Sequence, residues 1–71
     1  MKLHVEYEQE EDGRWIAEIP ELPGVMCYGT SLNDAAAKVE SLALRAIADC
    51  LDEGEMAASP IIIETVERAQ A

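Results

Sequence analysis

A single long helical pattern dominates this chain of 71 residues and limits the folds open to it. Apolar residues recur at steps of three and four between about residues 31 and 53, which predicts one amphipathic helix. Ser31 and Asp34 form a variant of the capping box at its start, and Gly54 suits the position that follows its end. The expected core stripe consists of Leu32, Ala36, Val39, Ala43, Ala46, Ile47 and Cys50.

Short strand patterns lie on both sides of this helix. Apolar and polar residues alternate from Leu3 to Glu8, and a second run from Arg14 to Ile19 follows the turn signal Asp12-Gly13. The segments Val25–Tyr28 and Pro60–Val66 predict a third and a fourth strand. The order β-β-β-α-β defines an α+β fold, in which the first three strands form an antiparallel meander. The helix packs on one sheet face, and the fourth strand lies parallel to the strand that it joins.

Size and charge narrow the possible partners. We expect one domain over residues 1–71, and its core is so small that a homo-oligomer, most simply a dimer, is predicted. The net charge of −10 argues against binding to bare nucleic acid or an anionic membrane and suits a basic partner. The sequence has no apolar run near the ~20 residues that span a bilayer and no signal-peptide core, so we expect a cytoplasmic location.

The chain offers few residues for catalysis or metal binding. Its only soft metal ligands are His4, Cys27 and Cys50, and no two of them stand at a ligand spacing. Neither Ser31 nor Ser41 has an obvious histidine partner, because His4 is the only histidine. No glycine-rich loop precedes a lysine in the manner of a phosphate-binding loop. We therefore expect a protein that is not an enzyme, with no catalytic residue, no cofactor and no metal.

Two surfaces are candidates for protein binding. Three consecutive isoleucines in the fourth strand indicate either burial on both faces or an exposed edge that awaits a partner. The candidate apolar interface consists of Ile61, Ile62, Ile63, Met26 and Tyr28. The candidate acidic surface follows the first strand into its turn and consists of Glu6, Glu8, Glu10, Glu11 and Asp12.

Trp15 is open to two interpretations. Tryptophan is enriched at protein interfaces, where it serves as an anchor. Trp15 also shares a strand face with Ala17 and Ile19, which favours a place at the edge of the small core. Ile16 then lies on the opposite face of the sheet, together with Met26 and Tyr28.

One combination of residues is more specific than any single motif. It comprises Tyr7, the stretch from Asp12 to Gly24, and the stretch from Gly29 to Ala35. An Asp-Gly turn, a tryptophan, a Pro–Pro–Gly bend and a glycine before a capped helix follow one another in this order. The combination resembles the N-terminal domain of HicB-family antitoxins, over most of the chain from about Tyr7 to Glu55.

This resemblance implies a partial RNase H-like fold and a non-enzymatic domain that binds and masks a small basic HicA-like toxin, an mRNA-cleaving enzyme. Many family members continue into a DNA-binding module, which we do not expect here because five residues follow Val66. Two other functions stay open. The chain could be a solitary HicB-like regulatory or structural domain, or a minimal metal-dependent RNase H-like nuclease.

Overall fold

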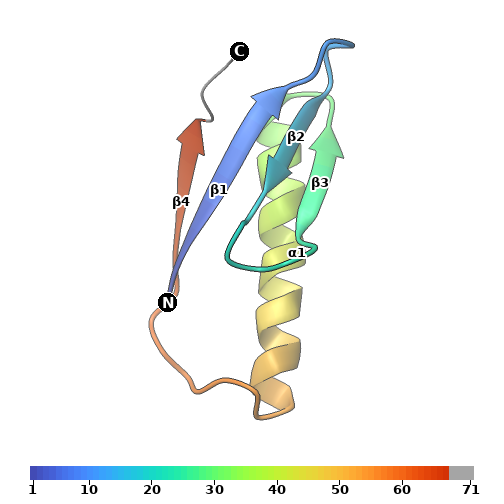
Figure 1. Ribbon diagram of the computed structural model, residues 1–71. Helices are drawn as coiled ribbons and strands as arrows, with labels where there is room; N and C mark the ends of the chain where they lie inside the picture. Colours follow the sequence, from blue (N-terminus) through green and yellow to red (C-terminus); the bar gives the residue numbers. More distant parts are fainter. Residues whose placement is uncertain (68–71) are drawn as a thin grey trace.

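The computed structural model describes residues 1–67 and contains one sheet and one helix (Figure 1). The sheet has the order β3-β2-β1-β4, with antiparallel pairing of β1 to β2 and of β2 to β3, and parallel pairing of β1 to β4. This arrangement confirms the predicted α+β fold, its β-β-β-α-β order and the antiparallel meander. The elements are β1 (Lys2–Gln9), β2 (Trp15–Glu18), β3 (Met26–Gly29), α1 (Leu32–Asp52) and β4 (Ile62–Glu67).

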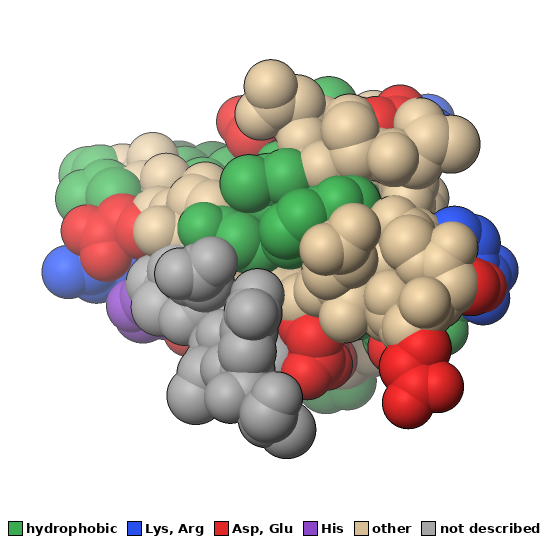
Figure 2. Space-filling model, turned by 90° about the horizontal axis from the view of Figure 1, so that it is seen from above, with side chains coloured by type: hydrophobic (Ala, Val, Ile, Leu, Met, Phe, Trp, Pro, Cys, Tyr) green, Lys and Arg blue, Asp and Glu red, His purple; other side chains and the backbone are tan. Residues whose placement is uncertain are grey.

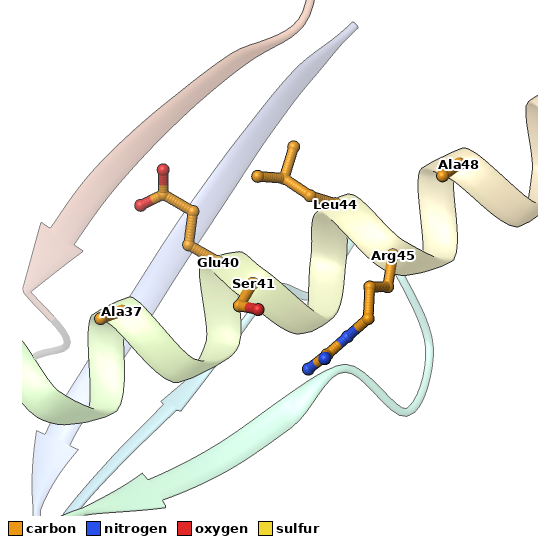
Figure 3. A pocket seen from close by; sticks show the side chains of 6 residues that line it. All are labelled: Ala37, Glu40, Ser41, Leu44, Arg45 and Ala48. Atoms are coloured by element: carbon orange, nitrogen blue, oxygen red, sulfur yellow. The ribbon is translucent and has the colours of Figure 1, made fainter.

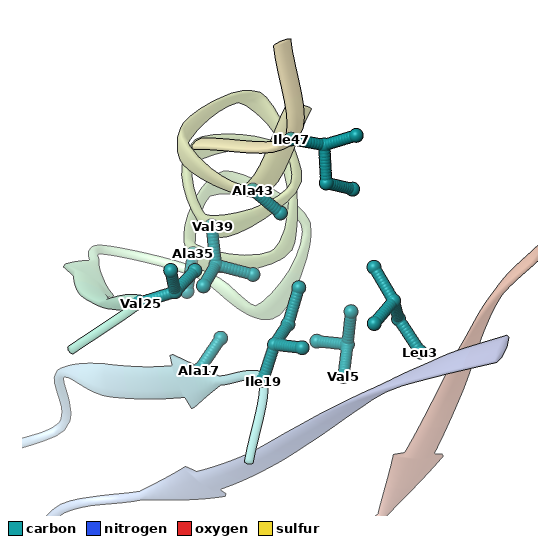
Figure 4. Close-up of a cluster of buried hydrophobic side chains, with 9 residues drawn as sticks. All are labelled: Leu3, Val5, Ala17, Ile19, Val25, Ala35, Val39, Ala43 and Ile47. Atoms are coloured by element: carbon teal, nitrogen blue, oxygen red, sulfur yellow. The ribbon is translucent and has the colours of Figure 1, made fainter. Parts of the chain in front are cut away.

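The core lies between α1 and one face of the sheet (Figure 4). Leu3 and Val5 alternate on β1, and both are 1% exposed. Trp15 is half-buried against this core. This position confirms the interpretation that places Trp15 at the edge of the small core. The buried cluster consists of Leu3, Val5, Ala17, Ile19, Val25, Ala35, Val39, Ala43 and Ile47.

The buried stripe of α1 is narrower than the predicted stripe. Of the seven predicted residues, Val39, Ala43 and Ile47 are buried, whereas Leu32, Ala36, Ala46 and Cys50 are only half-buried. Ala35, which was not part of the predicted stripe, is fully buried. Gly29, at the end of β3, lies directly against the backbone of Ala35. Ala35 therefore lies on the side of α1 that faces β3, and the core line advances from it by steps of four through Val39 to Ile47.

The fourth strand begins later than the sequence predicted. Pro60 has no backbone N–H to donate, and Ile61 also lies outside the ladder. Ile62 is the first paired residue, and its N–H donates to the carbonyl of Met1 at 2.9 Å. In the register, Ile63 lies beside Leu3 and packs against the core.

The start of α1 is held by a set of side-chain hydrogen bonds. The backbone N–H of Asp34 donates to Ser31 Oγ at 3.0 Å, as the capping pattern predicted. In return, the Asp34 carboxylate accepts from the N–H of Thr30 at 3.0 Å and lies 3.1 Å from Lys38 Nζ. The hydrogen bond from the Thr30 N–H is the main cause of a lowered pKa at Asp34, and the Lys38 ammonium is the second cause.

The end of α1 also follows the sequence prediction. Gly54, with φ of 73°, comes directly after the last turn of the helix.

Replacing Ser31 with alanine should lower the free energy of unfolding by about 1 kcal/mol, because an N–H of the first helical turn loses its acceptor. Urea unfolding followed by circular dichroism measures this change. Ser41→Ala is the matched control, since Ser41 is exposed in the middle of α1 and alanine favours a helix there. Equal stability of the Ser31 variant and the wild type would contradict the capping role.

Candidate protein-binding surface

The sheet face away from α1 is covered by no helix within residues 1–67 (Figure 1). Because Leu3, Val5 and Tyr7 point toward the core, the residues that alternate with them on β1, namely His4, Glu6 and Glu8, lie on the other face. The pairing registers then place residues of β2 and β3 beside them. We call the part of this surface formed by β1, β2 and β3 the open face; its residues are His4, Glu6, Glu8, Ile16, Glu18, Met26 and Tyr28. Lys2, Ile62 and Glu64 lie beside it on the same side of the sheet.

An apolar strip crosses the β2–β3 half of the open face. Ile16 lies opposite Tyr28 in the register and is only 8% exposed. Tyr28 and Met26 are 42% and 47% exposed, so the strip has a covered centre and accessible flanks. The Arg14 guanidinium lies 4.5 Å from the centroid of the Tyr28 ring, a cation–π distance that holds the ring against the sheet. Met26 and Tyr28 thus lie together, as the sequence predicted.

Acidic side chains border this strip on the β1 side. Glu8 lies opposite Ile16, and Glu6 lies opposite Glu18. The register thus places three carboxylate side chains side by side along this border, in an acidic row. Glu18 was missing from the predicted acidic surface, although its alternation with Ile16 along β2 placed it on this face.

The other predicted acidic residues lie at the end of the β1–β2 hairpin. Glu11 and Asp12 are exposed in the turn, and the N–H of Glu10 donates to the carbonyl of Arg14 at 2.7 Å. Asp12 Oδ2 accepts from Arg14 Nε at 2.8 Å, and the N–H of Arg14 is the main cause of a lowered pKa at Asp12. The structure therefore separates this turn from Glu6 and Glu8, which belong to the sheet.

The hairpin end of the molecule also carries an aromatic pair. The rings of Tyr7 and Trp15 have centroids 6.0 Å apart and a tilt of 53°. Both side chains are half-buried and pack against the core. Viewed from this end, apolar side chains gather in a patch beside acidic ones (Figure 2). The acidic surface therefore has apolar neighbours at this end as well.

His4 is held between two carboxylates. Its Nδ1 lies 2.5 Å from Glu21 Oε2, its backbone N–H donates to Glu21 Oε1 at 3.1 Å, and its Nε2 lies 3.8 Å from Glu64 Oε2. The bond from the His4 side chain is the main cause of a lowered pKa at Glu21. These contacts tie the loop after β2 to β1 and β4, so the geometry of His4 is that of a structural link.

The other soft ligands lie apart from His4. Cys27 and Cys50 are half-buried free thiols, and partial desolvation raises the pKa of Cys50. Among the described residues, no group of three or more histidine, cysteine, aspartate or glutamate side chains is placed to hold a metal ion.

The rest of the predicted apolar interface lies at the start of the edge strand β4 and in the residue before it. Ile61 and Ile62 are 39% and 52% exposed, whereas Ile63 faces the core. Of the two alternatives for the isoleucine run, burial on both faces or an exposed edge, the structure shows an exposed edge from which only Ile63 points into the core. Because β3 and β4 are the two opposite edges of the sheet, Met26 and Tyr28 do not form one patch with Ile61 and Ile62.

Comparison with known proteins found no similar protein. No family model matches the chain, and no curated protein and no solved structure matches it. The likeness to HicB-family domains therefore rests on the sequence pattern alone. Within residues 1–67, no helix has both the length and the apolar character to cross a bilayer.

Proposed function

We propose that the chain is a non-enzymatic, cytoplasmic interaction domain of the HicB-like type, which binds and masks a small basic protein through its open face. The observation that carries the proposal is the apolar strip of Met26, Ile16 and Tyr28 beside the acidic row. Aromatic residues and methionine are enriched at the centres of protein interfaces. The carboxylates beside them attract a basic partner and repel an acidic one. The HicB-like pattern points to an mRNA-cleaving HicA-like toxin as that partner.

Affinity capture from the source cells tests this function. The bait is the wild-type chain, and the matched control is a variant in which Glu6, Glu8 and Glu18 are all replaced by lysine. We expect the wild type alone to enrich a basic protein of similar size whose RNA cleavage stops on binding. Enrichment of no basic protein over the control would favour the solitary-domain alternative. Mg²⁺-dependent RNA cleavage by the purified chain itself would favour the nuclease alternative.

We further propose that the chain dimerises through β4. The outer edge of β4 presents backbone N–H and C=O groups, and a second β4 can pair with them about a two-fold axis. Ile61 and Ile62 would then be covered in the same contact, which adds apolar burial to a small core.

Ile62→Lys should therefore reduce the fraction of chains joined through β4 at least about tenfold and lower the mass of the assembly, because two lysines meet near the axis. Light scattering coupled to size-exclusion chromatography at micromolar concentration measures the mass. Ile62→Val is the control and should keep the wild-type mass. A wild-type chain that elutes only as a 7.8 kDa monomer at these concentrations would sink the dimer proposal.

A further inference from the structure

The outer face of α1 carries a regular stripe that the core does not use. Its five residues, which we call the outer seam, are Ala37, Ser41, Leu44, Ala48 and Leu51. All five are exposed, and the two leucines keep 47% and 38% of their surface accessible. The seam lies on the side of α1 away from the sheet, since the buried residues of the helix face the opposite way (Figure 4).

The spacing of the outer seam is that of a two-helix contact. Its steps alternate between four and three residues, so the seam follows the a and d positions of a heptad repeat. Ser41 and Ala48 stand at a positions, where small side chains let two helices approach closely. Leu44 and Leu51 stand at d positions, where leucine favours two-stranded pairing. A shallow, wide-open depression of about 570 Å³ lies along this face, and four seam residues, Glu40 and Arg45 line it (Figure 3).

Charges on the two flanks of the seam indicate which occupant fits. Glu40 lies on one flank and Arg45 on the other (Figure 3). In a parallel pair of identical helices, a residue at position g meets the residue five positions later, at position e of the partner. Glu40 and Arg45 are such a pair, and two-fold symmetry forms the contact twice. An antiparallel pair instead places g beside g and e beside e, which brings like charges together.

We propose that a second copy of this chain packs its α1 in parallel against the outer seam, with Glu40 of each copy beside Arg45 of the other. The leucines of one helix then fill the space beside the small seam residues of its partner. This surface is distinct from the open face and from the β4 edge, so the proposal stands apart from the function proposed above. A chain that used both two-fold contacts would assemble beyond a dimer.

Single-cysteine crosslinking tests the contact and its direction. In a Cys27→Ala/Cys50→Ala background, Ala48→Cys should join two chains when a short bismaleimide is added, because a parallel pair places position 48 beside itself. Ala58→Cys is the matched control, since Ala58 is exposed in the connector after α1. A yield for Ala48→Cys no higher than for Ala58→Cys would overturn the proposal. So would crosslinking of Ala48→Cys only to Ala37→Cys, the result of antiparallel pairing.

Charge exchange tests the pairing itself. In the Ala48→Cys protein, Glu40→Arg should lower the crosslinking rate several-fold, and adding Arg45→Glu should restore it. Circular dichroism shows whether each variant keeps its helix. Ile62→Lys, which acts on the β4 edge, should leave the Ala48→Cys crosslink in place. Loss of the crosslink in the Ile62→Lys protein, or no rescue by the second charge change, would overturn the helix contact.

Discussion

Gly29→Ala should cost at least about 3 kcal/mol of folding free energy, at the upper end of overpacking effects. A Cβ at Gly29 would lie 2.4 Å from the backbone nitrogen of Ala35 and 2.7 Å from its Cα. It would also lie 2.9 Å from the Asp34 carboxylate oxygen that accepts the Thr30 N–H. Backbone atoms in the first turn of α1 cannot move aside singly, so the substitution must separate β3 from the helix.

The control for this prediction is Gly13→Ala. Gly13 has φ of +92°, yet no atom lies within 4 Å of the Cβ position. Alanine at position 13 should lower the free energy of unfolding only by the cost of the left-handed backbone conformation, roughly 1–2 kcal/mol. Urea unfolding of both variants separates steric overlap from backbone strain. A Gly29 variant less destabilised than the Gly13 variant would contradict the close approach of β3 to α1.

Gly29 also illustrates which parts of this fold sequence patterns could predict. The capping residues and Gly54 marked the ends of α1, because local hydrogen bonds and a positive φ require those residue types. Gly29 was expected only as the end of a strand. Its φ is not positive, so its requirement for glycine comes from the contact between β3 and α1. Ala35, which Gly29 approaches, is buried and Ala36 is only half-buried, a difference that two neighbouring alanines do not reveal in the sequence.

In the candidate site, too, sequence patterns predicted some features and not others. Period-two alternation placed Met26 and Tyr28 away from the core, and the structure confirms their exposure. The place of Glu18 beside Glu6 depends on the register between β1 and β2, which single-strand alternation does not supply. The run from Ile61 to Ile63 was ambiguous for the same reason. Only the pairing with β1 shows that Ile63 faces the core.

The largest functional effect is expected in the rate at which the proposed basic partner associates. Replacing Glu6, Glu8 and Glu18 with lysine should lower this rate at least about tenfold at low salt, because long-range attraction to the open face becomes repulsion. The dissociation rate should change much less, since short-range apolar contacts hold the complex. Added salt should slow association of the wild type, because ions screen charges over about 10 Å at 0.1 M.

Biosensor kinetics with the captured basic protein measure both rates. The matched control replaces Asp49, Glu53 and Glu55, near the far end of α1, with lysine and changes the net charge by the same amount. It should retain most of the association rate, because the effect depends on where the charges lie and decays with distance. Tyr28→Ala should show the reverse pattern, with faster dissociation and nearly unchanged association. Equal slowing by both triple variants would attribute the effect to net charge alone, and an unchanged association rate in the open-face variant would remove that face from the binding site.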